Sequence, residues 1–273
     1  MTRKLTLAVA LATALAVSSA AQATVVQFQT ALGNFEINLY DQKTPGTVAN
    51  FLAYLNAGAY NNVVIHRSVK GFVIQGGGFA YAGSPQLATV SQNAAIANDP
   101  KYSNVRGTIA MAKLASSANS ATNQWFINLA DNSADLDVQN GGFTVFGEVT
   151  GTGMTVVDAI AALPVYNLGS PFDSIPLRDY TAGITITDRN FVAITPAIID
   201  ASPSTAASIT PKANTLINAS ASSGSTSSGG GGGGGAVGLG SVLGLGLLNV
   251  RVARSTPPPA RVRARPGPGR PPW

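Results

Sequence analysis

The chain has 273 residues, of which 45% are hydrophobic, enough to bury one full-size core. Two basic residues precede residue 24 and six arginines follow Val250, so residues 24–250 hold nine basic and twelve acidic side chains. This mildly acidic stretch argues against a nucleic-acid partner, and the absence of cysteine excludes disulfides and thiol chemistry.

Residues 1–23 have the three-part pattern of a secretory signal peptide. Arg3 and Lys4 precede an uncharged run from Leu5 to Val17, and the small residues end in Ala21–Ala23. A core helix or a membrane span is the alternative, but the run is short for a bilayer and an A-x-A site follows it. We therefore expect cleavage after this site and export to the periplasm or cell envelope, with surface anchoring or secretion as further alternatives.

The first elements of the mature chain are predicted to be a β-hairpin and a helix. Val25–Thr30 and Phe35–Tyr40 form the hairpin, because apolar and polar residues alternate in the second segment. A helix follows with Thr44 as N-cap and Pro45 in the first turn, and it ends before Gly58, where the backbone must become left-handed.

A second amphipathic helix is predicted from Thr152 to Leu163, where Pro164 stops it. Short apolar runs separated by Gly, Asn and Ser predict the strands of a barrel or sandwich. These runs are Val63–Ile65, Phe72–Ile74, Thr108–Met111, Trp125–Leu129, Phe143–Val149, Ile184–Ile186 and Phe191–Ile194. Together the elements predict one domain over residues 24–196.

The chain beyond Pro196 lacks the composition of a folded core. Residues 197–235 are rich in Ser and Gly and end in seven glycines, which predicts a flexible linker. Residues 236–254 join an uncharged segment to two arginines, and this order resembles a Gly-Gly type of C-terminal sorting signal, which in its family is handled by a rhomboid-like protease. The alternative is a low-complexity sequence that carries no sorting signal.

The uncharged segment Ala236–Val250 has fifteen residues, which is marginal for spanning a bilayer. A transient membrane association or a processed anchor therefore fits better than a permanent anchor. Residues 255–273 are nearly all Pro, Arg, Gly and Ala, which predicts a disordered tail. An out-of-frame extension is a hypothesis that the mass of the native C-terminus would test.

The segment His66–Gly78 places a lone arginine before an apolar pair, a glutamine and three glycines. It resembles the cyclophilin signature F-H-R-x-x-x-G-F-x-x-Q-G-G. Residues 106–112, 123–128 and 143–147 resemble later blocks of the same family in the correct order. The resemblance extends from about Val25 to Ile194 and follows the secreted bacterial members of this family of peptidyl-prolyl cis-trans isomerases.

The resemblance implies a mainly β fold, an eight-stranded antiparallel β-barrel capped by two α-helices. It also implies rotation of X-Pro bonds in proline-containing polypeptides by a monomer, without metal or cofactor. Arg67 matches the catalytic arginine. The wall of the proline pocket is matched by Phe72, Val73, Phe126, Leu136 and Phe143. The groove that holds the substrate main chain is matched by Gln75, Gln124 and the backbone near Ala112 and Lys113.

These residue types suit the chemistry. An X-Pro bond rotates slowly because its amide is conjugated, with a barrier of about 18–20 kcal/mol. A catalyst must hold the ring in an apolar slot and stabilise the twisted amide, whose nitrogen regains a lone pair. A guanidinium stays charged and presents fixed donors, so its attraction grows in the transition state. A lone arginine is more often a partner in a surface ion pair, but the surrounding motif favours the catalytic role for Arg67.

Other chemistry-bearing residues receive structural interpretations. His66 is the sole histidine and is expected to be a hydrogen-bonded core ring, since no nucleophile motif accompanies it. Gly76–Gly78 lack the Lys-Ser/Thr of a phosphate loop and predict close strand or turn packing. Asp131, Asp135 and Asp137 lack the glycine and glutamate of a calcium loop and predict a solvated loop.

Some positions depart from the family's usual residues. Asp135 stands where a tryptophan often binds cyclosporin and Phe143 stands where a histidine is usual, so we expect weak cyclosporin binding. Lys113 replaces the usual asparagine, and Val73 a common methionine. The preferred function is an isomerase that assists folding of exported proteins. The alternatives are a proline-peptide-binding scaffold with little catalysis and an envelope protein displayed by its tether.

Overall fold

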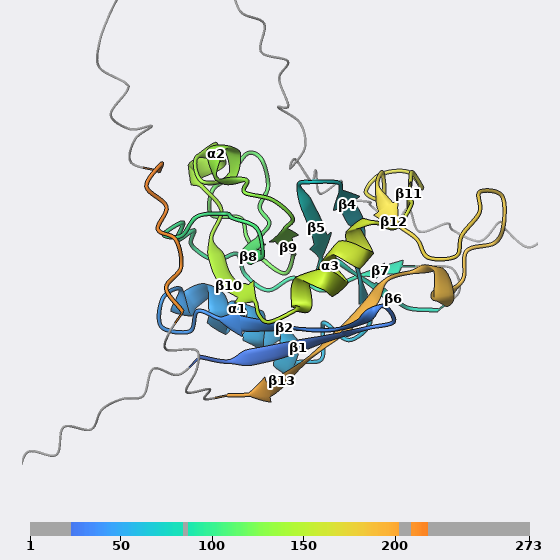
Figure 1. Ribbon diagram of the computed structural model, residues 1–273, viewed down its shortest axis with the longest axis horizontal. Coiled ribbons are helices and arrows are strands. Elements are labelled where there is room, and N and C mark those ends of the chain that lie inside the picture. Colours follow the sequence, from blue (N-terminus) through green and yellow to red (C-terminus); the bar gives the residue numbers. More distant parts are fainter. Residues whose placement is uncertain (1–22, 84–86, 202–208, 218–273) are drawn as a thin grey trace, which may run out of the picture.

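The computed structural model describes residues 23–83, 87–201 and 209–217, which form a mainly β domain (Figure 1). Apart from Ala23, the predicted signal peptide lies outside the described residues, as do the segments from residue 218 onward, including the glycine run and the apolar stretch after it. Among the described residues, no helix has the length and apolar character needed to cross a membrane.

The strands and helices are short, and most follow the predicted order. The strands are β1 Val25–Thr30, β2 Gly33–Leu39, β3 Val63–Val64, β4 Arg67–Val69, β5 Val73–Gly76, β6 Phe79–Tyr81, β7 Leu87–Thr89, β8 Thr108–Met111, β9 Trp125–Asn128, β10 Val145–Val149, β11 Val165–Tyr166, β12 Ile175–Pro176 and β13 Ala193–Asp200. The helices are α1 Pro45–Asn56, α2 Ser133–Leu136 and α3 Gly153–Ala161, and short 3-10 turns cover Gln139–Gly141 and Asp188–Asn190.

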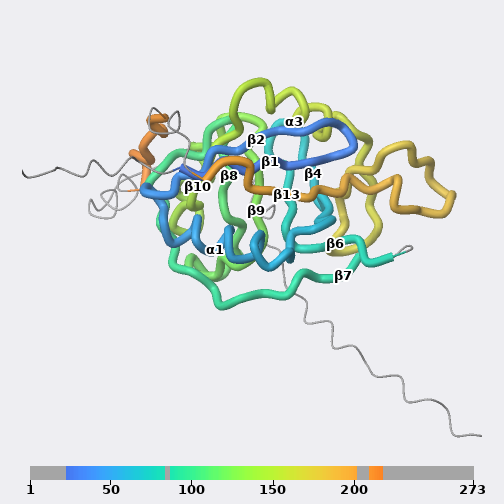
Figure 2. The backbone as a smooth tube through the Cα atoms, turned by 90° about the horizontal axis from the view of Figure 1, so that it is seen from below, coloured from blue at the N-terminus to red at the C-terminus, as the bar shows by residue number. Residues whose placement is uncertain are grey.

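One antiparallel sheet curls around the domain in the order β4-β5-β9-β8-β10-β2-β1-β13-β3-β6-β7, while β11 and β12 form a separate pair. This curled sheet with its few helices confirms the predicted fold class. Within the described residues it has eleven strands where eight were expected, and β-bulges shift the register within it, as between Val145 and Gly147 of β10. Figure 2 shows α1 and α3 on opposite sides of the strands.

The predicted hairpin and first helix are confirmed. β1 and β2 pair from Val25 opposite Asn38 to Thr30 opposite Gly33. α1 begins at Pro45, and Gly58 has a φ of +68° after its end. The predicted capping by Thr44 is only partly met, because the buried Thr44 hydroxyl makes no hydrogen bond and only the backbone carbonyl engages the first turn.

The prediction of a strand at Ile184–Ile186 is wrong. This run lies in a loop, and Ile184 is 53% exposed. The chain returns to the sheet through β13 instead, and its pairing with β1 continues to Asp200, beyond Pro196.

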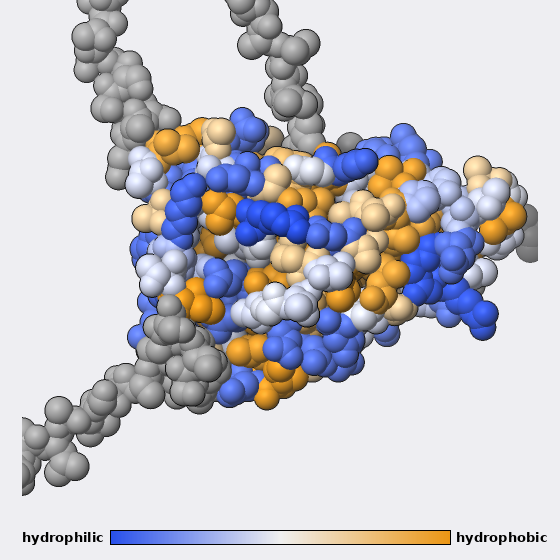
Figure 3. Space-filling model, viewed as in Figure 1, coloured by the Kyte–Doolittle hydropathy of each residue, from blue (hydrophilic) through white to orange (hydrophobic). Residues whose placement is uncertain are grey.

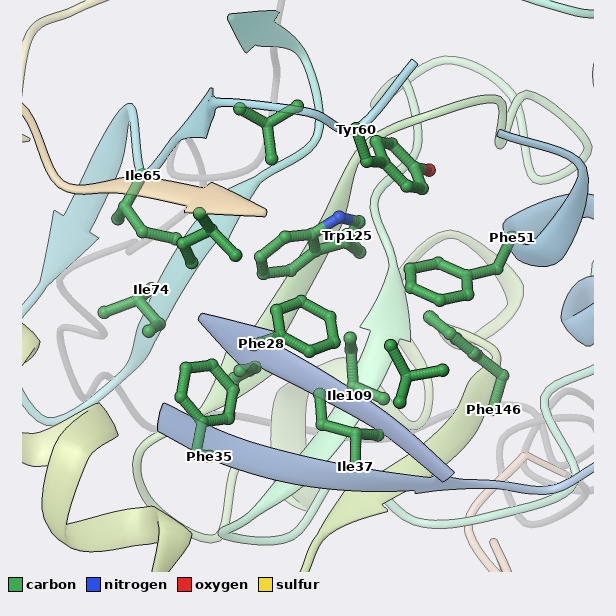
Figure 4. Close-up of a cluster of buried hydrophobic side chains, with 14 of the residues drawn as sticks. Phe28, Phe35, Ile37, Phe51, Tyr60, Ile65, Ile74, Ile109, Trp125 and Phe146 are labelled. Carbon is green, nitrogen blue, oxygen red and sulfur yellow. The ribbon is translucent and has the colours of Figure 1, made fainter. Parts of the chain in front are cut away.

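Large apolar side chains fill the inside of the curled sheet. Figure 4 shows Trp125 of β9 among Phe28, Phe51 and Ile109, and the Phe28 and Trp125 rings meet edge to face at 5.3 Å. Phe51 and Tyr54 come from α1, and Val157 and Ile160 from α3. Because the helices supply their apolar faces to the same cluster, they close the sheet into a rigid support.

A segment beyond the predicted domain end also contacts the domain. We call residues 209–217 the strap. The Ser103 amide donates to the Lys212 carbonyl at 2.8 Å, and the buried Asn214 side chain donates to the Asp137 carbonyl at 2.9 Å. The range expected as a linker therefore includes a hydrogen-bonded segment.

Apolar side chains also reach the surface. In Figure 3 they gather over the region of β11 and β12. Val165 of β11 is 49% exposed and Leu168 is 40% exposed. This surface adjoins β4, because the Ser68 amide donates to the Ser174 carbonyl at 2.8 Å.

Candidate functional site

A row of side chains crosses five neighbouring strands on the outer face of the curled sheet. Arg67 pairs with Gln75, Gln75 with Phe126, and Phe126 with Ala110. Ala110 in turn pairs with Val145. Directly opposed residues of antiparallel strands project from the same face, so the cationic, amide and apolar groups lie side by side.

The apolar part of this row forms a compact pocket wall. Its buried cluster contains Tyr40, Val73, Ala110, Ala112, Phe126, Leu136, Phe143 and Val145, with Phe72 packed against it at partial exposure. The Phe126 and Phe143 rings lie 5.7 Å apart at 75°, an edge-to-face arrangement. All five residues predicted to line the proline pocket are thus brought together in one cluster.

Arg67 is linked to the amides predicted to hold a peptide main chain. Its Nη1 donates to Gln75 Oε1 at 3.3 Å, and Gln75 Nε2 donates to Gln124 Oε1 at 2.9 Å. Gln75 is completely buried. Burial lowers the pKa of Arg67, but a guanidinium remains protonated in proteins. The result is a positive charge held beside an apolar wall.

The glycines after Gln75 let β5 approach residues 123–125 closely. Gly77 has a φ of +86°, and a Cβ there would lie 2.3 Å from the Asn123 carbonyl oxygen. A Cβ on Gly76 would lie 2.9 Å from the Trp125 ring. The predicted close packing is confirmed, and it brings the segment carrying Gln124 against the end of β5.

A cavity of about 270 Å³ lies beside the row and shares Ala112, Lys113 and Gln124 with the predicted groove. The Ala112 amide donates to the Gln124 carbonyl at 2.9 Å, which fixes the backbone between pocket and cavity. The cavity does not include Arg67 or Phe126 among its lining residues. The charged and aromatic groups therefore place the candidate chemistry on the row, with the cavity as an adjoining space.

Lys113 is 5% exposed, and its side chain points into the protein rather than into solvent. Its Nζ donates to the carbonyl oxygens of Asn140 at 2.9 Å and Gly142 at 2.5 Å. The Lys113 backbone therefore lies at the predicted groove, while its ammonium group binds the turn at residues 140–142.

His66 is a core residue, as predicted, but the predicted hydrogen bonds of its ring are not found. The ring is fully buried and meets Phe79 edge to face at 5.0 Å, and neither ring nitrogen has a hydrogen-bond partner of standard geometry. Burial lowers the pKa of His66 to about 4, and the nearby Val64 carbonyl and Gln124 side chain only partly oppose this shift. The ring is therefore neutral at physiological pH.

The acidic residues divide into two kinds. Asp131 and Asp135 are exposed, as predicted, but Asp137 is completely buried. Its Oδ1 accepts from the Asn104 amide at 2.8 Å and from Asn104 Nδ2 at 3.0 Å, so a solvated loop was the wrong prediction for this residue. Within residues 23–83, 87–201 and 209–217, no group of three acidic, His or Cys side chains could hold a metal ion.

Sequence reasoning missed the buried asparagines that support the pocket wall. Asn104 Nδ2 donates to the Phe143 carbonyl at 3.1 Å, and Asn128 Nδ2 reaches Thr108 Oγ1 at 2.9 Å. Asn132 Nδ2 donates to the Phe72 carbonyl at 2.9 Å. The only hint in the sequence is the position of Asn128 within a motif block, and nothing in the pattern marks Asn104 as buried.

Comparison with known proteins gives consistent matches. The family model described as cyclophilin type peptidyl-prolyl cis-trans isomerase/CLD matches residues 25–182. Peptidyl-prolyl cis-trans isomerase A of Dickeya dadantii is 40% identical over 163 residues, covering 59% of this chain and 82% of that protein. Peptidyl-prolyl cis-trans isomerase B of Escherichia coli is 42% identical over 159 residues, covering 57% and 94%.

Among solved structures, a crystal structure of a cyclophilin type peptidyl-prolyl cis-trans isomerase from Cryptosporidium parvum is similar at 22% identity. The alignment has a TM-score of 0.47 and covers 65% of this chain and 98% of that chain.

Proposed function

Because this chain belongs to the cyclophilin-type peptidyl-prolyl cis-trans isomerase family, we propose that it rotates X-Pro bonds at the outer-face row, with Arg67 as the catalytic residue. Peptidyl-prolyl isomerase activity is the activity of the family. The finer assignment concerns where on this chain the reaction takes place and which polypeptides it serves.

The proline ring packs against the wall of Phe126, Leu136 and Phe143. These side chains are at most 2% exposed in the free protein, and Phe72, Tyr102 and Ile209 pack against their cluster, so the ring reaches them only after a neighbouring side chain moves aside. Holding the ring while the preceding residue remains mobile lets the protein turn one side of the peptide bond against the other. The wall supplies binding that is common to the cis and trans forms.

Arg67 supplies the interaction that grows during rotation. As the amide twists, conjugation is lost and the proline nitrogen regains a lone pair, to which a guanidinium N–H donates. The hydrogen bond to Gln75 at 3.3 Å restricts the orientation of the guanidinium before substrate arrives. Because Arg67 stabilises the twisted amide more than the planar amide, it lowers the barrier to rotation of the X-Pro bond.

The observation that carries this proposal is the register of the sheet. Arg67, Gln75 and Phe126 are directly opposed on β4, β5 and β9 and therefore share one face. The adjoining cavity at Gln124 gives room for residues that flank the proline. A peptide bound there spans charge, apolar wall and backbone amides together.

A peptide titration monitored by NMR tests the location. With the ¹⁵N-labelled full chain and an Ala-Pro-containing peptide, we expect shift changes at Gln75, Ala112, Gln124 and Phe126 and few on β1 or β13. Phe126→Ala should weaken binding by about tenfold or more, since it removes a ring from the wall. Shift changes clustered at the surface of β11 and β12 instead would contradict the proposed site.

We further propose that the protein acts on exported polypeptides during folding. The support is the charged, apolar and small-residue order of residues 1–23 in the sequence. Fractionation of cells producing the full chain or a variant lacking residues 1–23 tests it. We expect only the full chain outside the cytoplasm, where it should accelerate a proline-limited refolding step, and equal distribution of the two would contradict export.

A further inference from the structure

Lys113 stands two residues after β8 ends and contacts one wall of the pocket. Its Nζ lies 4.6 Å from the centroid of the Phe143 ring, within the range of a cation–π contact. The same ammonium donates to the carbonyls of Asn140 and Gly142, just before Phe143 in the chain. One buried cation therefore joins the end of β8, the turn at 140–142 and an aromatic residue of the pocket.

The turn that Lys113 binds has an unusual backbone. Asn140, Gly141 and Gly142 all have positive φ values, of 51°, 73° and 70°. A Cβ on Gly142 would lie 2.7 Å from the Asp137 carbonyl oxygen, so the turn is pressed against the segment that carries Leu136. The carbonyl oxygens of Asn140, Gly141 and Gly142 accept hydrogen bonds from side chains outside the turn.

Asn98 and Lys113 supply those donors. Asn98 Nδ2 donates to Gly141 O at 2.7 Å and to Gly142 O at 2.9 Å. Asn140 Nδ2 donates back to Leu114 O at 2.8 Å, on the residue after Lys113. Because these bonds run in both directions, a shift of the turn would move the segment 112–114 as well as Phe143.

We propose that Lys113 is a positioning residue that holds the Phe143 wall of the proline pocket in place through the turn at 140–142. This inference rests on the proposed function, since it assigns Lys113 a role in the pocket placed there. The ammonium does not touch the substrate. It fixes the ring of Phe143 against Phe126, and its loss lets the wall move away from the bound proline.

The electrostatic surroundings make Lys113 open to a specific test. Residues 92–98 and 114–124, which contribute to the neighbouring cavity, and the turn at 139–143 contain no Asp, Glu, Lys, Arg or His. The buried Asp137 has its backbone against Gly142, and its Oδ1 accepts from the Asn104 backbone amide. The next charge along the chain, Asp99, pairs with Lys101 at 2.9 Å. Burial lowers the pKa of Lys113 to about 8, so this side chain is charged at neutral pH and loses its charge under mildly alkaline conditions.

The experiment compares full-chain Lys113→Met, Lys113→Arg and the surface control Lys101→Met. Isomerisation of an Ala-Pro peptide is followed by NMR exchange at several peptide concentrations, which gives KM and kcat separately. At neutral pH we expect Lys113→Met to raise KM about tenfold with kcat within about twofold, since a displaced wall weakens ground and transition states alike. Lys113→Arg should stay within about threefold of wild type, because it restores charge and donors, and Lys101→Met should match wild type.

The pH profile supplies a second readout that does not depend on the Met variant folding. The KM of the wild type should rise as pH passes through about 8, while the KM of Lys113→Arg stays level over the same range. Parallel pH profiles, an unchanged KM in Lys113→Met, or failure of arginine to restore KM would each overturn the inference. If Phe126→Ala weakens binding in the same assay while Lys113→Met does not, this inference fails and the proposed site stands.

Discussion

The link between Arg67 and Gln75 yields a prediction whose size follows from its geometry. Gln75→Met keeps the length of the side chain but removes two hydrogen bonds, from Arg67 Nη1 at 3.3 Å and to Gln124 Oε1 at 2.9 Å. A hydrogen bond to a charged group contributes about 1.5–3 kcal/mol, and the long distance places this one at the lower end. We therefore expect kcat/KM to fall by about tenfold.

A double-mutant cycle shows whether this loss passes through Arg67. If Gln75 acts by orienting the guanidinium, Gln75→Met should cost little in an Arg67→Ala background, with a coupling energy of at least about 1 kcal/mol. Both backgrounds are measured in the protease-coupled assay of an Ala-Pro peptide, with urea unfolding to check the fold. Gln29→Met, at an exposed position of β1, is the control and should behave as wild type. Equal losses in the two backgrounds would refute the orienting role.

Three further predictions concern stability, each measured by denaturant unfolding. Gly77→Ala should lower the free energy of unfolding by more than the about 1–2 kcal/mol expected for a left-handed alanine, because its Cβ would lie 2.3 Å from a carbonyl oxygen. Gly71 has a φ of +70° and nothing within 4 Å of its Cβ position, so Gly71→Ala should lose only the conformational part. Equal losses of stability in the two variants would contradict the close contact. His66 has a pKa of about 4 in the folded protein against 6.5 normally, so its stabilising contribution is complete above pH 6.5 and lost as pH falls through 4. That loss is about 3 kcal/mol and should vanish in His66→Phe, and an identical pH dependence in the variant would refute it. Asn214→Ala removes the strap's hydrogen bonds to the carbonyls of Pro100 at 3.1 Å and Asp137 at 2.9 Å and should cost about 1–3 kcal/mol. An unchanged unfolding midpoint would show that these two bonds add no stability.

The elements that were predicted well are those set by local pattern. Alternation fixes β1 and β2, since each side chain faces either the core or water along a regular strand. Pro45 and Gly58 mark the limits of α1 because each favours one backbone conformation. The motif blocks located Arg67 and the pocket wall, which the sheet register then brought to one face.

The features that escaped prediction depend on distant contacts. Asp137 is buried because Asn104, 33 residues away, supplies its donors, and no local pattern records that pairing. Ile184 belongs to an apolar run that favours a strand, yet it lies exposed in a loop. The role of Lys113 likewise comes from carbonyls 27 and 29 residues further along the chain. Tertiary context decides such cases.

The contribution of Arg67 to turnover tests the account most directly. The kcat/KM of the full chain for an Ala-Pro peptide is compared between wild type, Arg67→Ala and Arg189→Ala, the last at an exposed arginine far from the row in sequence. Loss of charge-assisted hydrogen bonds worth about 1.5–3 kcal/mol predicts a fall of about 10- to 100-fold for Arg67→Ala and none for the control. Wild-type turnover in a correctly folded Arg67→Ala protein would contradict the mechanism.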